Sequence, residues 1–255
     1  MEKKETGSGL LKSRWLGRKK TRDEEKFTEQ SLIFLIRHTI LAGLQYKSLD
    51  EYVQEKYPTD KRFPKIKKQW SDVKVGIRVS IYKNGNLRGS KGSLESKTNV
   101  YDDVLEYTKT AAFKDERFPK INGKEFRYLE FEVTIIENER IPIEYKDPME
   151  LLVILGKSKD MGVMVKKDKK SSYFLSDTWD LIPEPGMFMS SLCLSADLPA
   201  SSWRGQKRIW PSKRTELRRD LYTGKIVKPS EWGRLEVLHI PCMRIKGRGN
   251  TLKDV

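Results

Sequence analysis

Apolar residues recur at helical spacing near the start of the chain. Between residues 27 and 46, Leu32, Ile36 and Ile40 follow one another four residues apart, and this period predicts an amphipathic helix. The preceding residues, 1–26, are rich in charged side chains of both signs and show no apolar period, so we expect a basic, mobile tail there.

Two further helices are predicted from their caps. Ser48 and Glu51 have the spacing of a capping box, which places the start of a short helix at Ser48 and its end before Pro58. Asn99 is the expected N-cap of a helix over residues 100–113, where apolar residues again recur four apart.

Strict alternation of apolar and polar side chains predicts two strands. Residues 75–82 alternate in this way, and a KNGN turn follows them. The next segment, LRGSKGSLE, is interpreted as a glycine-rich loop. Residues 129–135 also alternate, and their polar face carries Glu130, Glu132 and Thr134. One face of each strand is therefore expected to lie in the core.

The second half of the chain mixes short helices and strands. Asp147 and Pro148 resemble the start of a helix, although the LLVIL run that follows also fits a buried strand. A hairpin over 161–175, a helix over 187–194 and a final strand over 234–245 complete the pattern. Because no regular strand–helix–strand rhythm is present, we expect an α+β fold with a mixed, mainly antiparallel sheet and flanking helices.

Composition limits the class of protein. The 255 residues include two cysteines and two histidines, which argues against a disulfide framework and against a cysteine–histidine metal site. No apolar run reaches the ~18 residues of a membrane span, and the first residues do not resemble a signal peptide. We therefore expect a cytoplasmic protein without a membrane partner. The sequence does not indicate which cofactor, if any, the protein uses.

The net charge of +15 is densest in one segment. Arg204–Arg219 carries seven basic residues and one acidic residue, with tryptophan interleaved. Basic side chains beside an aromatic ring suit RNA or single-stranded DNA, through phosphate contacts and base stacking. They equally suit a solvated face or a protein-docking segment. The candidate nucleic-acid-binding residues are Lys207, Arg208, Trp210, Lys213, Arg214, Arg218 and Arg219.

One octet is nearly repeated. TDKRFPKI at 59–66 and KDERFPKI at 114–121 match at six positions, yet nothing else aligns between the two regions, so a duplicated unit is excluded. Each copy follows a predicted helix. We expect Phe-Pro to end that helix and to return the chain to the core.

The second copy of the octet belongs to an ordered series of motifs. The series runs through Leu87, Arg88, Gly89, Gly92, Ala112, Asp115, Arg117, Phe118, Pro119, Glu132 and Val133, and ends on LCLSADLP at 192–199. It resembles the AMMECR-domain family, named for the Alport syndrome, midface hypoplasia and elliptocytosis chromosomal region, over about residues 27–245. The resemblance implies a large and a small subdomain around a cleft. A basic insertion near 205–234 and a C-terminal tail at 246–255 are then expected.

The chain departs from the family pattern at one informative place. Ser90 and Lys91 stand where the family has Cys-Ile, and a hydroxyl without a base is a poor nucleophile. We therefore expect no cysteine-dependent mechanism. Family members often accompany MEMO-like and radical SAM proteins, so the resemblance implies a component of a modification pathway alongside such partners, without naming the reaction.

Charged residues of three motifs are expected to converge in one cleft. Paired carboxylates can act as acid and base, and glycines let backbone amides approach an anion; ion pairs and a tight turn are the structural alternatives. Two functions stay open, an enzyme component that uses this cleft and a non-catalytic nucleic-acid- or protein-binding module that uses 204–219. The candidate catalytic residues are Arg88, Asp115, Arg117 and Glu132, and the candidate ligand loop is Gly89, Ser90, Lys91 and Gly92.

Overall fold

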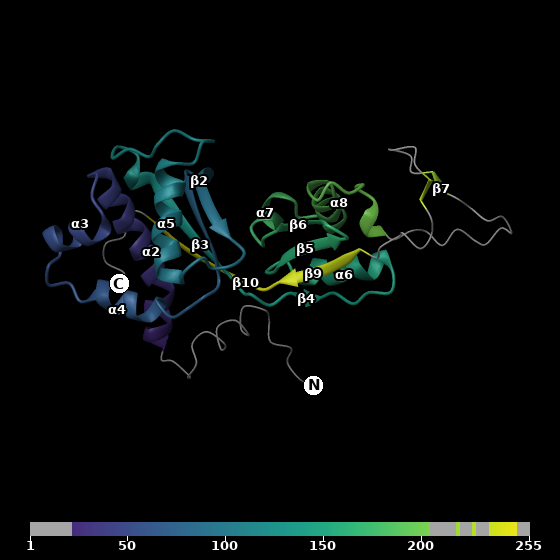
Figure 1. Ribbon diagram of the computed structural model, residues 1–255, viewed down its shortest axis with the longest axis horizontal. Coiled ribbons are helices and arrows are strands. Elements are labelled where there is room, and N and C mark those ends of the chain that lie inside the picture. Colours follow the sequence, from purple (N-terminus) through teal and green to yellow (C-terminus); the bar gives the residue numbers. More distant parts are fainter. Residues whose placement is uncertain (1–21, 205–217, 220–225, 228–234, 249–255) are drawn as a thin grey trace. The chain divides into compact units, whose positions relative to one another are not determined.

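The chain folds into two units. The computed structural model describes residues 22–204, 218–219, 226–227 and 235–248. Unit 1 comprises Met1–Asn138 and Cys242–Val255, and unit 2 comprises Glu139–Pro241 (Figure 1). In chain order, the second unit is thus inserted between two parts of the first.

The helices of unit 1 follow the predicted apolar period. Leu32, Ile36 and Ile40 are fully buried, so their four-residue spacing marks the inward face of the first helix. Trp70 fastens a later helix to it, because the indole Nε1 donates to Ser31 Oγ at 2.9 Å. The helices are α2 (Arg22–Leu44), α3 (Leu49–Lys56), α4 (Arg62–Trp70) and α5 (Val100–Phe113), with the 3-10 turn η1 (Phe126–Tyr128).

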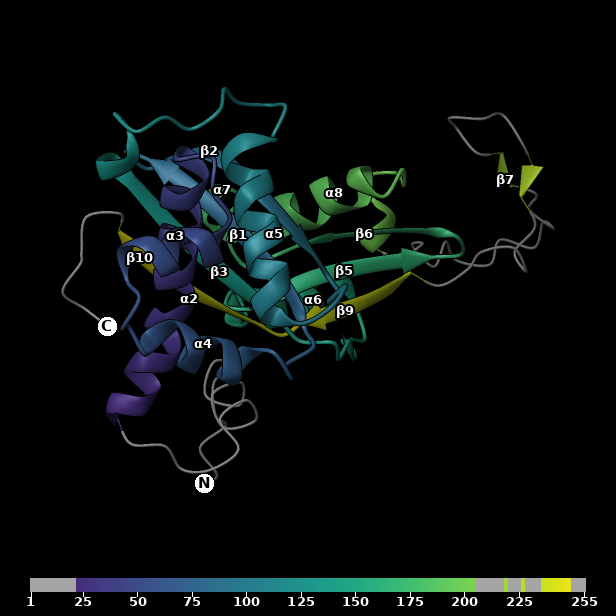
Figure 2. The ribbon, with the colours of Figure 1, turned by 60° about the vertical axis from the view of Figure 1, so that its left-hand side comes forward.

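Antiparallel strands form the sheet of unit 1 in the order β10-β3-β1-β2. Val79, Ile81 and Val133 lie on the face that joins α2 and α5 in one core, and the residues between them point to the opposite face. Figure 2 shows α5 running beside α2 along this sheet. The strands are β1 (Gly76–Lys83), β2 (Asn86–Ser93), β3 (Leu129–Ile136) and β10 (Cys242–Arg248).

Unit 2 has its own antiparallel sheet, in the order β4-β9-β5-β6. α8 packs on β5 and β6, and α6 packs on α8. Trp179 stacks on Phe188 in this core, with ring centres 3.5 Å apart. The elements are β4 (Ile141–Pro142), α6 (Pro148–Lys157), β5 (Gly162–Lys167), β6 (Lys170–Phe174), α7 (Thr178–Leu181), α8 (Pro185–Ser195), η2 (Ser202–Arg204), the two-stranded β7 (Arg218–Arg219) and β8 (Ile226–Val227), and β9 (Glu236–Ile240).

The predicted fold class and three predicted helix caps are confirmed. The fold is α+β, with two antiparallel sheets and flanking helices. Ser48 and Glu51 form a complete capping box, and Asn99 caps α5. Asp147 accepts hydrogen bonds from two backbone N–H groups at the start of α6. The LLVIL run is therefore helical, and the alternative of a buried strand is excluded. No helix in the described part of the chain is long and apolar enough to cross a membrane.

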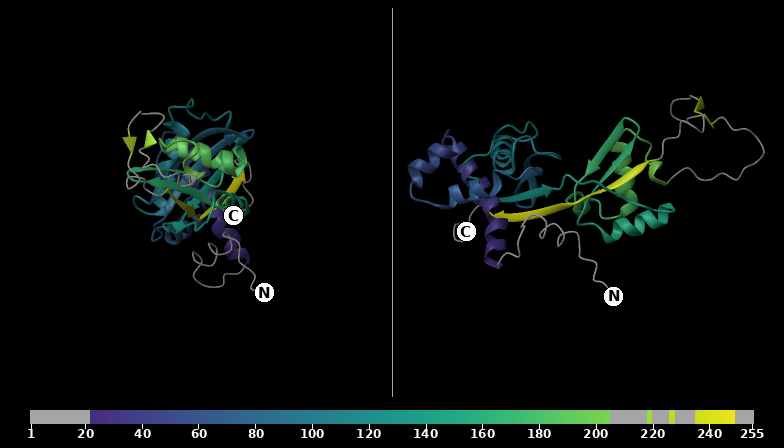
Figure 3. Two further views of the ribbon diagram at one scale, coloured as in Figure 1. Left: turned by 90° about the vertical axis from the view of Figure 1, so that its right-hand side faces the viewer. Right: turned by 60° about the horizontal axis from the view of Figure 1, so that its bottom comes forward.

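Two predicted segments differ from the structure. The final strand over 234–245 is two strands, because Pro241 has no N–H to pair and separates β9 of unit 2 from β10 of unit 1. Figure 3 shows these as successive yellow strands. The glycine-rich segment after the KNGN turn is also not a loop, since residues 86–93 pair with β1 as strand β2.

The ends of two elements, and the role of proline in the first octet, also differ from expectation. α2 begins at Arg22, inside the predicted tail, and β10 continues to Arg248, past the predicted domain end at 245. In the first octet, Pro64 lies in the first turn of α4, where its missing N–H breaks no helical hydrogen bond. This copy therefore begins a helix.

Close packing explains the glycines of β2. A Cβ atom on Gly89 would collide with the backbone carbonyl oxygen of Ala111 on α5, and one on Gly92 would lie 2.6 Å from Arg78 Cα on β1. Both positions need a hydrogen in place of a side chain because backbone approaches them directly.

Gly89→Ala should therefore destabilise unit 1 by about 1–3 kcal/mol, because overpacking forces the backbone to shift. Gly123→Ala is the matched control, since no atom lies within 4 Å of a Cβ built there. Urea denaturation of the two variants measures the difference. Equal stabilities would show that α5 does not press on β2 in this way.

His38 lies buried in an aromatic cluster. It is 1% exposed, and the ring centres of Phe34, Tyr57 and Phe63 lie 4.1, 5.4 and 5.2 Å from its own. Its Nδ1 lies 2.9 Å from the Phe34 carbonyl oxygen, so Nδ1 carries the proton and donates. Burial is the largest cause that lowers the pKa of His38 to about 4.

Acid should consequently destabilise unit 1 through this ring. The unfolded chain binds the proton near pH 6.5, whereas the folded ring stays neutral until about 4, so a fall in pH between these values favours unfolding. The loss amounts to about 2 kcal/mol between pH 7.5 and pH 5. Thermal melts of wild type and His38→Phe at the two pH values measure it. A variant with the same pH dependence as wild type would refute this assignment.

Candidate functional site

Ser90, Asp115 and Arg117 form a hydrogen-bonded cluster, here called the Ser90 site. The Asp115 carboxylate accepts the backbone N–H of Ser90 at 2.9 Å, and Nε and Nη2 of Arg117 at 2.9 and 2.7 Å. Arg117 Nη2 also donates to Ser90 Oγ at 2.8 Å. β2 is an edge strand, so Asp115 satisfies an N–H that no neighbouring strand can pair.

The two charges of the site differ in exposure. The Asp115 side chain is 7% exposed, and the Arg117 side chain is 58% exposed. Hydrogen bonding to Arg117, with a contribution from the Ser90 N–H, holds the pKa of the Asp115 carboxyl well below its usual range. The same pair raises the pKa of Arg117. Arg117 Nη1 makes no hydrogen bond with the described residues, so its two donors remain for a ligand.

The first octet forms the same local ion pair and explains the repeat. Arg62 donates from its backbone N–H and from Nε to Asp60 Oδ1, at 2.9 and 3.0 Å, as Arg117 does to Asp115. The Arg62 guanidinium lies over Phe34, 4.6 Å from the ring centre. Asp-x-Arg is thus a compact pair used twice, and the second copy adds the contact to the edge strand.

A polar row crosses the sheet from Ser90. In the strand register, Ser90 faces Ser80 on β1, Ser80 faces Glu132 on β3, and Glu132 faces Lys246 on β10. Directly paired residues of antiparallel strands project to the same face, and this face is opposite the one that carries Val79. The row therefore spans all four strands on the side away from α2 and α5.

Glu132 is the buried charge of this row. Its side chain is 2% exposed, and its Oε2 accepts Arg244 Nη2 at 2.9 Å and lies 3.3 Å from Lys246 Nζ. Its Oε1 has no hydrogen-bond partner in the described chain, and neither do the buried hydroxyls of Ser80 and Thr134. Each unsatisfied buried polar group costs about 1–3 kcal/mol, so this face holds three groups suited to a ligand.

Arg88 lies in a network of its own, apart from the Asp115–Arg117 pair and from Glu132, which pairs with Arg244. It occupies the bulge in β2, where Nη2 donates to Glu125 Oε1 at 2.9 Å and Nη1 donates to the Pro119 carbonyl oxygen at 2.6 Å. Arg88 thereby ties the end of the second octet to the edge strand. The four charged side chains expected in one cleft therefore make their hydrogen bonds in three separate groups.

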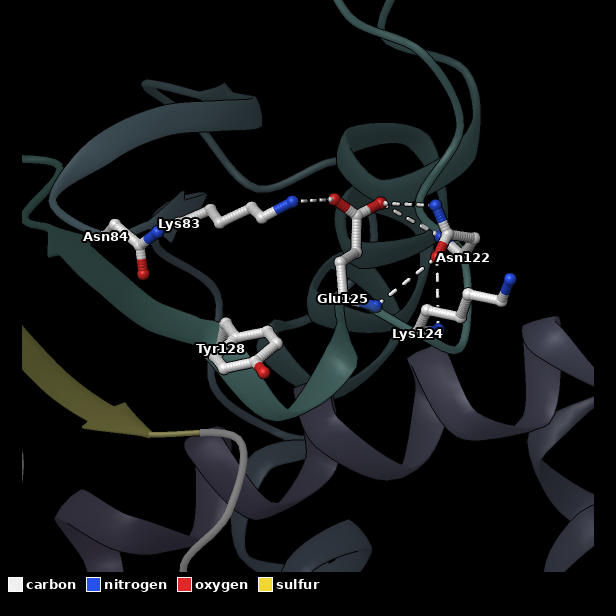
Figure 4. A pocket seen from close by; sticks show the side chains of 6 residues that line it. All are labelled: Lys83, Asn84, Asn122, Lys124, Glu125 and Tyr128. Atoms are coloured by element: carbon white, nitrogen blue, oxygen red, sulfur yellow. Dashed lines mark hydrogen bonds and ion pairs between the residues drawn. The ribbon is translucent and has the colours of Figure 1, made fainter.

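Glu125 is the centre of that network. Its carboxylate also accepts Lys83 Nζ at 3.1 Å and the Asn122 backbone N–H at 3.0 Å. Burial by itself would raise the pKa of Glu125, but these hydrogen bonds and those from Arg88 more than offset it and lower the pKa. Glu125 also lines a hollow of about 420 Å³ together with Asn84, Lys124 and Tyr128, whose side chains Figure 4 draws. Because its neighbours already saturate this carboxylate, we interpret Glu125 as structural.

The remaining candidates are placed as follows. Lys91 is exposed on the edge strand, next to Ser90. Lys207, Arg208, Trp210, Lys213 and Arg214 lie outside the described residues, and Arg218 and Arg219 are described as the backbone of β7. Within the described ranges, no group of three or more His, Cys, Asp or Glu residues could hold a metal ion.

Sequence reasoning singled out neither Ser80 nor Thr134 as a candidate site residue, and it missed Arg244 and Lys246 altogether. Alternation within residues 75–82 and 129–135 already assigns the first two to the polar side. The pairing of β3 with β10 joins residues more than 100 positions apart, and no periodic signal within either strand encodes that register. The cations beside Glu132 could therefore not be named from the pattern.

Comparison with known proteins identifies the family. The AMMECR1 family matches residues 43–211. A protein of Methanococcus aeolicus is 27% identical over 160 residues, which cover 60% of this chain and 77% of the relative. A protein of Nanoarchaeum equitans is 29% identical over 156 residues, covering 58% and 82%. The crystal structure of an uncharacterized protein from Pyrococcus horikoshii has a TM-score of 0.57 at 18% identity, over 86% of this chain and 91% of that chain, so it shares the fold.

The family match includes every residue of the Ser90 site. It spans the edge strand β2 and the second octet, and it extends from the end of α2 into the second unit. The matched range is more than half of the chain. This protein is therefore a member of the AMMECR1 family.

Proposed function

We propose that this AMMECR1-family chain binds an anionic ligand at the Ser90 site. The Arg117 guanidinium carries the proposal, because Asp115 holds it beside Ser90 while more than half of the side chain stays exposed. A planar guanidinium with free donors binds carboxylate or phosphate oxygens with defined geometry. Arg117 Nη1 is the atom that contacts the ligand in this proposal.

The polar row supports a ligand that extends beyond its anionic group. Ser80 neighbours Ser90 across the strands, and Glu132 follows it in the same row. The unpaired Glu132 Oε1 accepts a hydrogen bond, and the Ser80 hydroxyl both donates and accepts. A ligand that lies along this row carries a hydroxyl or amide at a distance of about two strand spacings, roughly 10 Å, from its anionic end.

Binding is favoured over covalent catalysis by Ser90. A serine nucleophile needs a base within hydrogen-bonding reach of its hydroxyl. The Ser90 hydroxyl instead accepts from Arg117, and the Asp115 carboxylate contacts the Ser90 backbone N–H. In this proposal Arg117 and Glu132 bind the ligand, Asp115 positions Arg117, and Arg88 supports the edge strand.

The family resemblance supports a place for this binding step in a modification pathway. Members often accompany MEMO-like and radical SAM proteins. We infer that the chain holds an anionic substrate or intermediate for an enzyme of that kind. In this proposal the partner enzyme supplies the reacting groups. The Ser90 site agrees with this, because its arginine and carboxylate are hydrogen-bonded to each other and its described residues include no activated nucleophile.

Arg117→Gln should weaken phosphate binding at the Ser90 site at least tenfold, because the variant removes the charged fork that meets the anion. The Ser90 backbone N–H signal in an NMR titration with sodium phosphate reports this site alone. Wild type should show a saturable shift of that signal, and the variant should not.

Arg62→Gln is the matched control, since Arg62 forms the same local pair with Asp60 but makes no contact with Ser90, whereas Arg117 donates to the Ser90 hydroxyl. It should leave the phosphate-induced shift of the Ser90 signal unchanged. Should wild type show no saturable shift, or should both variants lose it equally, the Ser90 site is not an anion site.

Nucleic-acid binding by the segment Arg204–Arg219 is a second candidate, which the net charge of +15 favours. Phosphate contacts then dominate the affinity, and each one adds about −0.7 to the log–log salt slope for single strands. Replacing Lys213, Arg214, Arg218 and Arg219 with Gln should reduce that slope by about three units. Fluorescence anisotropy with single-stranded RNA at several salt concentrations measures it. Identical slopes, or no binding at low salt, would remove nucleic acid as a partner of this segment.

A further inference from the structure

A buried arginine in unit 1 has no acidic partner among the described residues. Arg37 on α2 is 8% exposed, and its Nε is fully buried without a hydrogen bond. Its guanidinium carbon lies 6.0 Å from the ring centre of Phe126, but no carboxylate of the described residues pairs with it. Two buried carboxylates of the same unit differ from it in this respect, since Glu125 and Glu132 each contact two cations.

The next residue presents a buried acceptor to the same surroundings. Because Nδ1 of His38 donates to the Phe34 carbonyl, its Nε2 carries the lone pair, and this atom has no partner in the described chain. The ring centres of Tyr52 and Tyr57 lie 6.4 and 5.4 Å from that of His38. The same two tyrosines are the electrostatic neighbours of Arg37. Both tyrosines are thus ring neighbours of His38 and electrostatic neighbours of Arg37.

An unpaired guanidinium inside a protein is unfavourable. The charge loses its hydration without gaining a counter-ion, which costs more than burial of a complete ion pair. Burial is accordingly the largest cause that lowers the pKa of Arg37. Buried polar groups in native proteins almost always have a partner, so a donor at Arg37 beside an acceptor at His38 indicates a ligand that supplies both complements.

We propose that a second binding site in unit 1, for a small oxyanion that carries a hydroxyl group, is formed by Arg37, His38, Tyr52 and Tyr57. Arg37 pairs with the oxyanion. The hydroxyls of Tyr52 and Tyr57 share one hydrogen bond, which leaves one O–H to donate to another ligand oxygen, and His38 Nε2 accepts the ligand O–H. Hydrogen phosphate and a 2-hydroxycarboxylate share this chemistry, whereas acetate lacks the hydroxyl. No residue is shared with the Ser90 site, so this inference goes beyond the proposed function.

Isothermal titration calorimetry of the full chain carrying Arg117→Gln tests the proposal, because that background removes the anion contact of the Ser90 site. The probes are sodium phosphate, L-lactate and acetate. Phosphate or lactate should bind at least tenfold more tightly than acetate, and whichever binds more tightly identifies the source of the oxyanion. Adding Arg37→Met should weaken that binding at least tenfold. Adding Arg62→Gln instead should not, since Arg62 is paired with Asp60.

Thermal unfolding gives a second readout. Loss of an unpaired buried charge in Arg37→Met should leave Tm unchanged or raise it, whereas loss of a structural arginine lowers it. Unchanged affinity in Arg37→Met, equal binding of acetate, or no binding of any probe overturns the proposal.

A conservative variant covers the case in which Arg37→Met does not fold. Arg37→Lys keeps a charge but lacks the planar fork, so it should weaken binding severalfold, and unchanged affinity there overturns the proposal equally. The NMR titration of the Ser90 signal fails or succeeds independently of this experiment, because the calorimetry is done without the Arg117 side chain.

Discussion

The pleat of the unit 1 sheet is the constraint on which the rest of the structure depends. Because neighbouring side chains of a strand point to opposite faces, β1 and β3 can bury Val79 and Val133 under the helices only by turning Ser80 and Glu132 to the other side. A shift of one residue in the register would exchange these sets and bury charge in the apolar core. The hydrophobic effect therefore aligns the polar row as strongly as it aligns the core.

The edge strand turns this alignment into a site. β2 has backbone N–H groups that no further strand pairs, and the carboxylate of Asp115 takes up the one on Ser90. The same carboxylate accepts a hydrogen bond from Arg117. A single buried charge therefore satisfies a backbone N–H at the sheet edge and also orients an exposed cation. Close packing against α5 requires glycine at position 89. The glycine lets β2 lie close to α5, and the second octet follows α5 directly in the chain.

The buried charges of unit 1 differ in how completely neighbouring groups satisfy them. Glu125 is held by Arg88 and Lys83, and its environment is complete. Glu132 is paired on one oxygen and unpaired on the other. Arg37 has no acidic partner among the described residues. Glu125, whose charge is fully satisfied, holds the fold together, whereas Glu132 and Arg37 are the poorly satisfied residues that we propose contact ligands.

The sequence by itself determined the elements that depend on local chemistry. Alternation assigned the faces of β1 and β3, and the capping side chains of Ser48 and Asn99 located the starts of α3 and α5, because such signals act within a few residues. The motifs also placed Asp115 and Arg117 in one candidate site. Tertiary structure alone decided that Arg88 pairs with Glu125. It also decided that β10 brings its cations to Glu132, which precedes them by more than 100 residues in the chain. Strand register and ion pairing are set by packing between distant segments, and no local pattern carries that information.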